Sequence, residues 1–127
     1  MQTQILLIED DADLRAEMQE YLERRGHACL ACETVADAKA ALGRMQPDVV
    51  LSDICLPDGD GLTFCMENAP HHPRARWLLM SGNQDIVRTR QRALGKGISI
   101  VDKPLSLRLL NEFICRSPDK MTLAYAA

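Results

Sequence analysis

The chain has 127 residues, of which 46% are hydrophobic and 26% are charged, a composition typical of a single globular domain. The net charge of −3 gives no general attraction to a polyanion, so direct binding of nucleic acid is not expected. There is no apolar run near the roughly 18 residues of a membrane helix, and the first four residues lack the basic start of a secretory signal. We therefore expect a cytoplasmic protein without membrane contact.

The first half of the chain alternates short apolar runs with amphipathic stretches. Ile5–Ile8 is an apolar run typical of a strand that is buried on both faces, and residues 14–22 follow with apolar side chains at helical spacing. Ala28–Cys32 is a weaker strand, suited to a sheet edge. Thr34 is expected to be the N-cap of a second helix, and Val49–Leu51 forms a third strand that runs into an Asp.

The second half continues this alternation after a turn-rich segment. Residues 56–61 (LPDGDG) are dense in turn formers, and a short helix is expected over residues 62–67, broken by the prolines that follow. Trp77–Met80 predicts a fourth strand. A helix over residues 84–94 comes next and ends at glycines.

Ile98–Val101 and a last helix around residues 107–114 complete five β and five α units. We expect one domain over residues 1–116 and a C-terminal tail or linker over 117–127. Strict alternation predicts an α/β fold with a parallel sheet and helices on both faces. Right-handed crossovers and the weak second strand favour a flavodoxin-like, doubly wound (βα)5 three-layer sandwich with strand order 2-1-3-4-5.

Polar side chains gather where these strands end. Glu9 and Asp10 follow the first strand, Asp53 the third, Ser81 the fourth and Lys103 the fifth. Ligands of such sheets bind beyond the carboxyl ends of the strands. Each pair of carboxylates about 4 Å apart costs about 4 kcal/mol at an effective dielectric constant near 20, so the cluster needs a cation or raised pKa values. Oxygen ligands suit Mg²⁺, and a lysine and a hydroxyl beside them favour a small oxyanion such as a phosphoryl group.

These residues belong to motifs that resemble a known family, the (CheY-like) receiver domains of two-component response regulators. The matching segments, in chain order, are Ile8-Glu9-Asp10-Asp11, residues 53–61 (DICLPDGDG), Met80-Ser81-Gly82 and Lys103-Pro104. Each motif alone is weak evidence. Four of them in the correct order at the correct strand ends are strong evidence.

The resemblance implies a phosphorylation site and a magnesium site. Asp53 is then the phosphoacceptor, which attacks a phosphohistidine of a sensor histidine kinase or phosphotransfer protein. Asp10, Asp53 and the backbone carbonyl of Cys55 are expected to bind Mg²⁺ directly, whereas Glu9 acts mainly through metal-bound water. The protein is then a switch and not an enzyme, apart from its own Mg²⁺-dependent phosphotransfer and slow self-dephosphorylation.

The resemblance also implies how phosphorylation changes the conformation of the domain. Lys103 pairs with a phosphoryl oxygen, and Ser81 moves to hydrogen-bond the phosphoryl group. The peptide bond before Pro104 resembles one that is cis in the family. Ile100 departs from the pattern, since the family usually has Tyr or Phe there, and this puts the coupling to output in doubt while leaving phosphorylation intact.

A basic set of residues marks the expected fourth helix: Arg88, Arg90, Arg92 and Lys96. They form either a solvated face or part of a partner surface. The family uses the fourth helix, fifth strand and fifth helix for homodimers or effectors, so that surface is the alternative to plain solvation. The sequence contains no recognisable output module.

A degenerate receiver that binds partners without phosphorylation is the main alternative function, and Ile100 keeps it open. A flavodoxin relative is disfavoured because the loop after the first strand is acidic and would repel a flavin phosphate. A dehalogenase-type phosphatase is disfavoured because Cys55 stands where a second Asp is needed.

Other acidic residues have simpler roles. Asp11 is expected to cap the first helix, and Asp58 and Asp60 to serve turn formation.

The cysteines and histidines also have simple interpretations. Cys29 and Cys32 lie three apart on a strand and so face opposite sides, which argues against a redox or zinc pair. Cys65 and Cys115 are expected to pack on helix faces, and His71-His72 to lie in a solvated loop.

Overall fold

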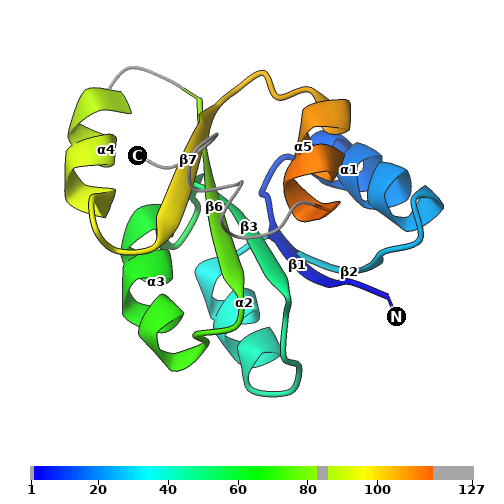
Figure 1. The fold of residues 1–127 in the computed structure, drawn as a ribbon, viewed down its shortest axis with the longest axis horizontal. Helices are drawn as coiled ribbons and strands as arrows, with labels where there is room; N and C mark the ends of the chain where they lie inside the picture. The colour runs from blue at the N-terminus through cyan, green and yellow to red at the C-terminus, as the bar shows by residue number, and fades with distance from the viewer. Residues whose placement is uncertain (1, 83–85, 116–127) are drawn as a thin grey trace.

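The computed structural model describes residues 2–82 and 86–115. Their main sheet has five parallel strands in the order β2-β1-β3-β6-β7, which is the predicted order 2-1-3-4-5 once a separate small hairpin is set aside (Figure 1). In sheet order, the strands are β2 (Ala28–Cys32), β1 (Gln4–Ile8), β3 (Val49–Asp53), β6 (Arg76–Ser81) and β7 (Ile98–Asp102). The predicted flavodoxin-like fold is confirmed.

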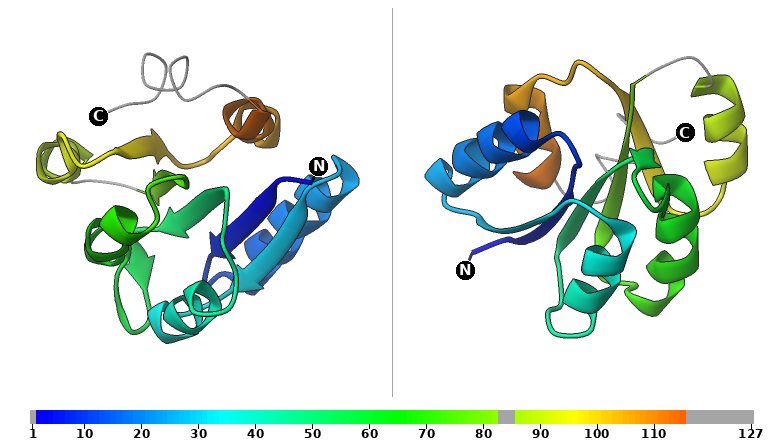
Figure 2. Two further views of the ribbon diagram at one scale, coloured as in Figure 1. Left: turned by 60° about the horizontal axis from the view of Figure 1, so that its bottom comes forward. Right: turned by 180° about the vertical axis from the view of Figure 1, so that it is seen from behind.

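Five α-helices of the described residues cover the main sheet in two layers. They are α1 (Ala12–Arg24), α2 (Val35–Leu42), α3 (Gly61–Asn68), α4 (Ile86–Ala93) and α5 (Leu107–Cys115). Helices α1 and α5 lie on one face of the sheet, and α2, α3 and α4 lie on the other (Figure 2). The tail expected at 117–127, residue 116, and residues 84–85 of the expected fourth helix lie outside the described residues.

The central strands are buried on both faces, as their apolar runs predicted. Successive residues of a strand point to opposite sides, so Ile5 and Leu7 pack into the core beneath α1 and α5, while Leu6 and Ile8 pack into the core beneath α2 and α3. Full burial of an apolar side chain of this size stabilises the fold by about 1.5–3 kcal/mol relative to exposure. The two cores fix the sheet, and with it the edge where the strands end.

The edge strand β2 and the helix that follows it also agree with the sequence. Cys29 packs with the α1 and α5 side and Cys32 with the other, so these two thiols lie on opposite faces as predicted. Thr34 caps α2 by accepting a hydrogen bond from the backbone N–H of Asp37 at 3.0 Å.

Three details differ from the prediction. The turn-rich segment contains a two-stranded antiparallel hairpin, β4 (Cys55–Leu56) and β5 (Gly59–Asp60). Helix α3 ends at Asn68, before Pro70 as predicted, but it is followed by an unpredicted 3₁₀ turn, η1 (Ala69–His71), whose first turn tolerates a proline because the N–H groups there have no partner within the turn. Cys115 is exposed at the end of α5 and not packed on a helix face, whereas Cys65 is buried as predicted.

Candidate functional site

The sheet delivers the predicted site residues to a single edge. Glu9 directly follows β1, Asp53 is the last residue of β3, Ser81 ends β6 and Lys103 directly follows β7. Parallel strands that start at one edge must end at the other, which is why residues up to 94 positions apart in sequence meet here. Glu9 is 1% exposed and Asp53 8% exposed, so two carboxylates are largely withdrawn from water.

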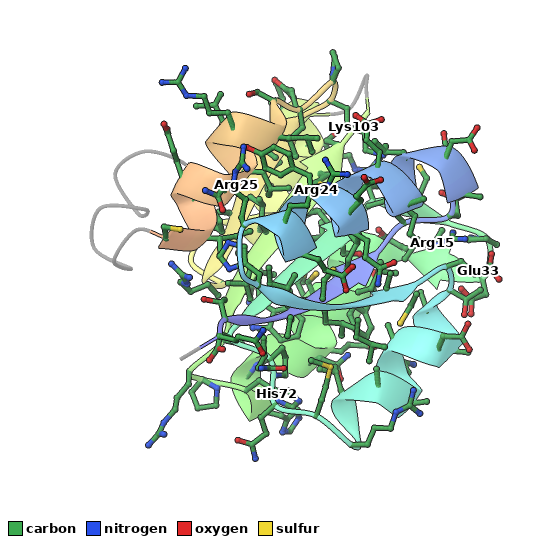
Figure 3. All side chains as sticks on the ribbon, turned by 90° about the vertical axis from the view of Figure 1, so that its right-hand side faces the viewer. Arg15, Arg24, Arg25, Glu33, His72 and Lys103 are labelled. Atoms are coloured by element: carbon green, nitrogen blue, oxygen red, sulfur yellow. The ribbon has the colours of Figure 1, made fainter. Side chains whose placement is uncertain are left out.

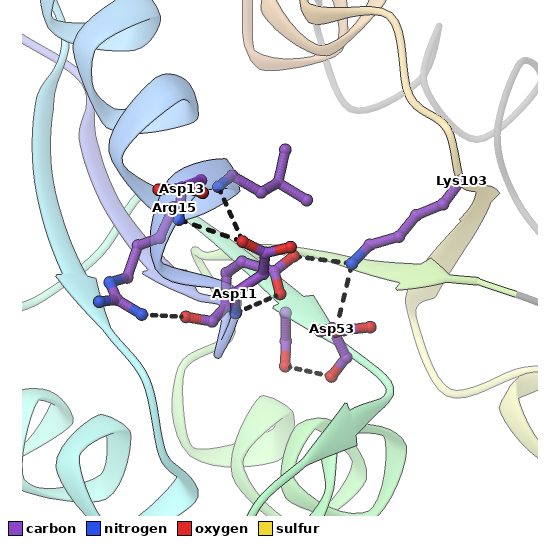
Figure 4. Close-up of polar contacts among 8 residues, drawn as sticks. Asp11, Asp13, Arg15, Asp53 and Lys103 are labelled. Atoms are coloured by element: carbon purple, nitrogen blue, oxygen red, sulfur yellow. Dashed lines mark hydrogen bonds and ion pairs between the residues drawn. The ribbon is translucent and has the colours of Figure 1, made fainter.

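Lys103 joins two of the carboxylates (Figure 4). Its Nζ lies 2.7 Å from Oε1 of Glu9 and 3.2 Å from Oδ2 of Asp53. Burial disfavours the charged ammonium, but the hydrogen bond to Glu9 and the charge of Asp53 outweigh it and raise the pKa of Lys103. Lys103 therefore stays cationic at neutral pH.

Two hydrogen bonds hold the carboxylate of Glu9 in place. Burial raises the pKa of Glu9, and the neighbouring Asp53 adds to this, while the hydrogen bonds from Lys103 and from the backbone N–H of Asp11 oppose it. The Asp11 N–H donates to Oε2 of Glu9 at 3.2 Å. Asp11 also caps α1, as predicted, by accepting hydrogen bonds from the backbone N–H groups of Asp13 and Leu14.

Arg15 of α1 contacts the loop after β1, and the sequence interpretation missed it. From α1 it donates a hydrogen bond to the backbone carbonyl of Glu9 at 2.8 Å, and it lies 3.8 Å from the carboxylate of Glu33 beyond β2 (Figure 3). The contact ties the acidic loop to the first helix. A single arginine on a helix gives no sequence signal for such a backbone contact.

Three carboxylates form the one group of metal-ligand type found among residues 2–82 and 86–115. One oxygen each from Glu9, Asp10 and Asp53 all lie within 4.8 Å of one another. Opposite ligands of an octahedral Mg²⁺ are about 4 Å apart, and the ion binds to one or two carboxylates while it keeps several waters. The donor chemistry and spacing fit Mg²⁺. Asp10 is exposed, and so a metal here is open to solvent and to a reaction partner.

Cys55 and Ser81 flank this cluster. Cys55 begins β4 two residues after Asp53. Ser81 is buried at the end of β6, and its backbone carbonyl accepts a hydrogen bond from the N–H of Lys103 at 2.7 Å. The Lys103–Pro104 peptide bond is cis.

Ile100 lies inside the sheet and not at the site. It is 2% exposed and packs in the core on the side of α2, α3 and α4. A buried β-branched side chain of this kind has little rotamer freedom.

The segment after Asp53 is anchored by acidic residues, which the sequence predicted only as turn formers. Asp58 accepts hydrogen bonds from the backbone N–H groups of Val35 and Ala36 at 2.7 and 3.0 Å, and so helps to cap α2. These bonds hold the pKa of Asp58 below its usual range. Asp60 caps α3 through the N–H of Leu62.

Gly61 lies against the backbone of the predicted phosphoacceptor. A Cβ atom on this glycine would lie 1.9 Å from the backbone oxygen of Asp53. The close approach requires glycine, and it locks the start of α3 to the end of β3.

The predicted solvated histidine pair lies far from this site. His72 is at the opposite end of the molecule from Lys103 (Figure 3), with its ring centroid 6.2 Å from that of Trp77. It does not contribute to the acidic cluster.

Comparison with known proteins decides the family. The model of the response regulator receiver domain matches residues 5–114. The chain belongs to the receiver domain family of response regulators. The receiver fold is shared with the CheY-like receiver domain protein of Methanospirillum hungatei JF-1, which has a TM-score of 0.86 at 22% identity, covering 98% of this chain and 99% of that one.

Relatives of this receiver domain include much longer regulators. It is 29% identical over 119 residues to the C4-dicarboxylate transport transcriptional regulatory protein DctD of Rhizobium meliloti, covering 94% of this chain and 26% of that protein. It is 33% identical over 82 residues to the DNA-binding transcriptional regulator NtrC of Proteus hauseri, covering 65% of this chain and 17% of that protein. NtrX of Brucella abortus matches with a TM-score of 0.81 at 26% identity, over 98% of this chain and 28% of that one. The chain thus spans between 17% and 28% of the length of these regulators. Over the described ranges, the helices are too short or too polar to cross a membrane.

Proposed function

We propose that this receiver domain is a phosphorylation switch in which Asp53 accepts a phosphoryl group from a phosphohistidine of a sensor histidine kinase or phosphotransfer protein. A carboxylate oxygen of Asp53 attacks the phosphorus atom, a P–O bond forms, the P–N bond breaks, and its electron pair stays on the imidazole. The observation that carries the proposal is the meeting of Glu9, Asp10 and Asp53 within 4.8 Å, with Lys103 in contact with two of them.

The residues of this site have separate roles in binding the metal and the phosphoryl group. Asp10, Asp53 and the Cys55 carbonyl would hold Mg²⁺, and Glu9 would act through metal-bound water. The bound ion supplies positive charge for the phosphoryl oxygens, which is most of what phosphoryl transfer asks of a protein. Lys103 exchanges its contact with Asp53 for one with a phosphoryl oxygen.

Ser81 responds to the negative charge that phosphorylation adds at Asp53. Its hydroxyl, at the end of β6, moves to hydrogen-bond the phosphoryl group, which adds nearly two negative charges at neutral pH. The conformational equilibrium then shifts by the difference in contact energy between the two loop arrangements.

We further propose that residues 1–116 form the receiver and that 117–127 is a tail or linker, in a cytoplasmic protein that acts as a switch and not as an enzyme. The output surface is α4, β7 and α5, which binds a second copy or an effector. The longer relatives support a place for such a domain in a larger regulator. Direct nucleic-acid binding by this domain is not proposed, since its net charge is −3.

The degenerate receiver, which binds partners without phosphorylation, is not favoured. Ile100 is the one departure that supports it, and Ile100 lies in the core and leaves the acidic cluster complete. We expect phosphorylation to proceed and its coupling to differ from that of a receiver with an aromatic residue here.

Amide spectra with Mg²⁺ and beryllofluoride, a phosphoryl mimic, test the proposal. We expect shifts at the amides of Asp53, Ser81 and Lys103 in the wild type, and none in Asp53→Asn, which lacks the anchoring carboxylate. Unchanged spectra in a folded wild-type sample would contradict it.

A further inference from the structure

One arginine of helix α4 forms an ion pair with the hairpin that follows Asp53, beside a surface hollow that Arg88 and Thr89 of α4 also line. The guanidinium of Arg92 lies 3.2 Å from Oδ2 of Asp60 and 3.3 Å from Oγ1 of Thr63. Among the described residues, this is the only ion pair that joins α4 to the rest of the domain.

Asp60 connects helix α4 to the start of helix α3, and we call it, with its contacts to Thr63 and Arg92, the junction. Its Oδ1 accepts from the backbone N–H of Leu62, and its Oδ2 accepts from the hydroxyl of Thr63 at 3.0 Å, so it caps α3 while it binds Arg92. A guanidinium that contacts both the carboxylate and the hydroxyl fixes the direction of both side chains. Movement of α4 must therefore move this junction or break its contacts.

The junction is connected to the metal-binding backbone by direct contacts. Asp60 pairs in register with Cys55 across the β4–β5 hairpin. The next residue, Gly61, donates its N–H to the carbonyl of Ile54 at 2.7 Å and lies against the backbone oxygen of Asp53. Two strands of two residues are not stable alone, so their position depends on such anchors.

We propose that Arg92 is a positioning residue for the magnesium site: through Asp60 it fixes the β4–β5 hairpin that carries the Cys55 carbonyl. This inference rests on the proposed function. Because linkage is reciprocal, Mg²⁺ binding at the rim then restrains α4, and a partner that holds α4 in this place tightens the metal site. With Ile100 buried in the core, this contact gives the site a route to α4 that does not use that side chain.

Simple electrostatics predicts the opposite effect of removing Arg92. Loss of a positive charge, with release of the Asp60 carboxylate, makes the surroundings more negative and should favour a divalent cation. Loss of a positioning contact weakens binding. The sign of the change therefore separates the two explanations, most clearly in about 1 M KCl, where the Debye length is about 3 Å.

The experiment compares Arg92→Gln with Arg88→Gln as a matched control. Arg88 is an exposed arginine one turn earlier on α4. It lines the same hollow beside the hairpin, but it forms no ion pair with any residue of the described ranges, so it controls for charge and position without the Asp60 contact. The Mg²⁺ dissociation constant is measured by titration of amide shifts in the high-salt buffer. Hydrogen exchange of the α4 amides is followed with and without Mg²⁺, and urea unfolding confirms that each variant is folded.

We expect Arg92→Gln to weaken Mg²⁺ binding roughly three- to tenfold and Arg88→Gln to change it less than about twofold. Mg²⁺ should slow exchange of the α4 amides in the wild type and in Arg88→Gln, but not in Arg92→Gln. If Arg92→Gln binds Mg²⁺ as tightly as the wild type or more tightly, or if Arg88→Gln weakens Mg²⁺ binding as much as Arg92→Gln does, the inference about Arg92 is overturned. The proposed function is not affected by either result. A folded wild type that binds no Mg²⁺ would overturn the proposed function as well.

Discussion

Replacing Asp10 with Asn should stabilise the metal-free protein, which is the reverse of what most substitutions do. Asp10 lies in a cluster in which one oxygen each of Glu9, Asp10 and Asp53 are within 4.8 Å of one another. Lys103 pairs with Glu9 and Asp53, and among the described residues no cation pairs with Asp10. Asn has almost the same shape and carries no charge, so only the repulsion is removed.

The size of the gain follows from these distances. Two unit charges 4.8 Å apart repel by about 0.9 kcal/mol in water and about 3.5 kcal/mol at an effective dielectric constant of 20. Because Asp10 is exposed, the lower value applies better to its repulsion from Glu9 and to its repulsion from Asp53. Part of the repulsion from the adjacent Glu9 persists in the unfolded chain. The expected stabilisation is about 1–3 kcal/mol.

Urea unfolding in EDTA and in excess Mg²⁺ measures both halves of this prediction. The Asp10→Asn protein should be more stable than the wild type in EDTA and should gain much less stability from Mg²⁺, because a ligand that binds only the folded state stabilises it by RT ln(1 + L/Kd), where L is the free ligand concentration, and this value falls as binding weakens. Asp37→Asn is the matched control. It removes a carboxylate from the first turn of α2, where we expect a loss of about 0.3–1 kcal/mol and an unchanged response to Mg²⁺.

The reasoning would be refuted if Asp10→Asn were less stable than the wild type in EDTA. It would also be refuted if the variant kept the full stabilisation by Mg²⁺. Either result would mean that Asp10 is not part of a repulsive cluster that the cation relieves.

Two further substitutions test the packing around the site. Gly61→Ala should destabilise the domain by about 3 kcal/mol or more in urea unfolding, because its Cβ would lie 1.9 Å from the backbone oxygen of Asp53. The control Gly43→Ala, at the end of α2, should have little effect on stability. Equal effects of the two substitutions would contradict the packing argument. Burial raises the pKa of the Cys65 thiol, so its contribution is complete below the unfolded pKa near 9 and is lost as pH rises above it. The wild type should therefore lose stability above pH 9 more steeply than Cys65→Ala, by about 1.4 kcal/mol per pH unit, and parallel curves in reducing buffer would show that this thiol is not withdrawn from water.

The edge of the sheet was predictable because its position depends on periodicity alone. Apolar runs mark the parallel strands, and the one or two residues after each run must lie at the common edge. The sequence therefore predicted that Glu9, Asp53 and Lys103 come together, and the structure brings Lys103 within 2.7 Å of Glu9.

The contacts that anchor the β4–β5 hairpin were not predictable in this way. The segment is rich in Gly, Pro and Asp, so turn propensity hides the two short strands. Asp58 caps a helix 23 residues earlier in the chain, and Asp60 meets an arginine 32 residues later. Such partners are chosen by the tertiary fold, and no local pattern of residues specifies them.

The account depends most on Asp53 as phosphoacceptor, and intact mass after incubation with acetyl phosphate tests this directly. Wild type and the Asp37→Asn control should each gain one phosphoryl group in the presence of Mg²⁺ and none in EDTA, with peptide mapping to Asp53. Asp53→Asn should gain none. A folded wild type whose mass does not change with Mg²⁺ and acetyl phosphate, or an Asp53→Asn protein that is labelled as fully as the wild type, would contradict the account.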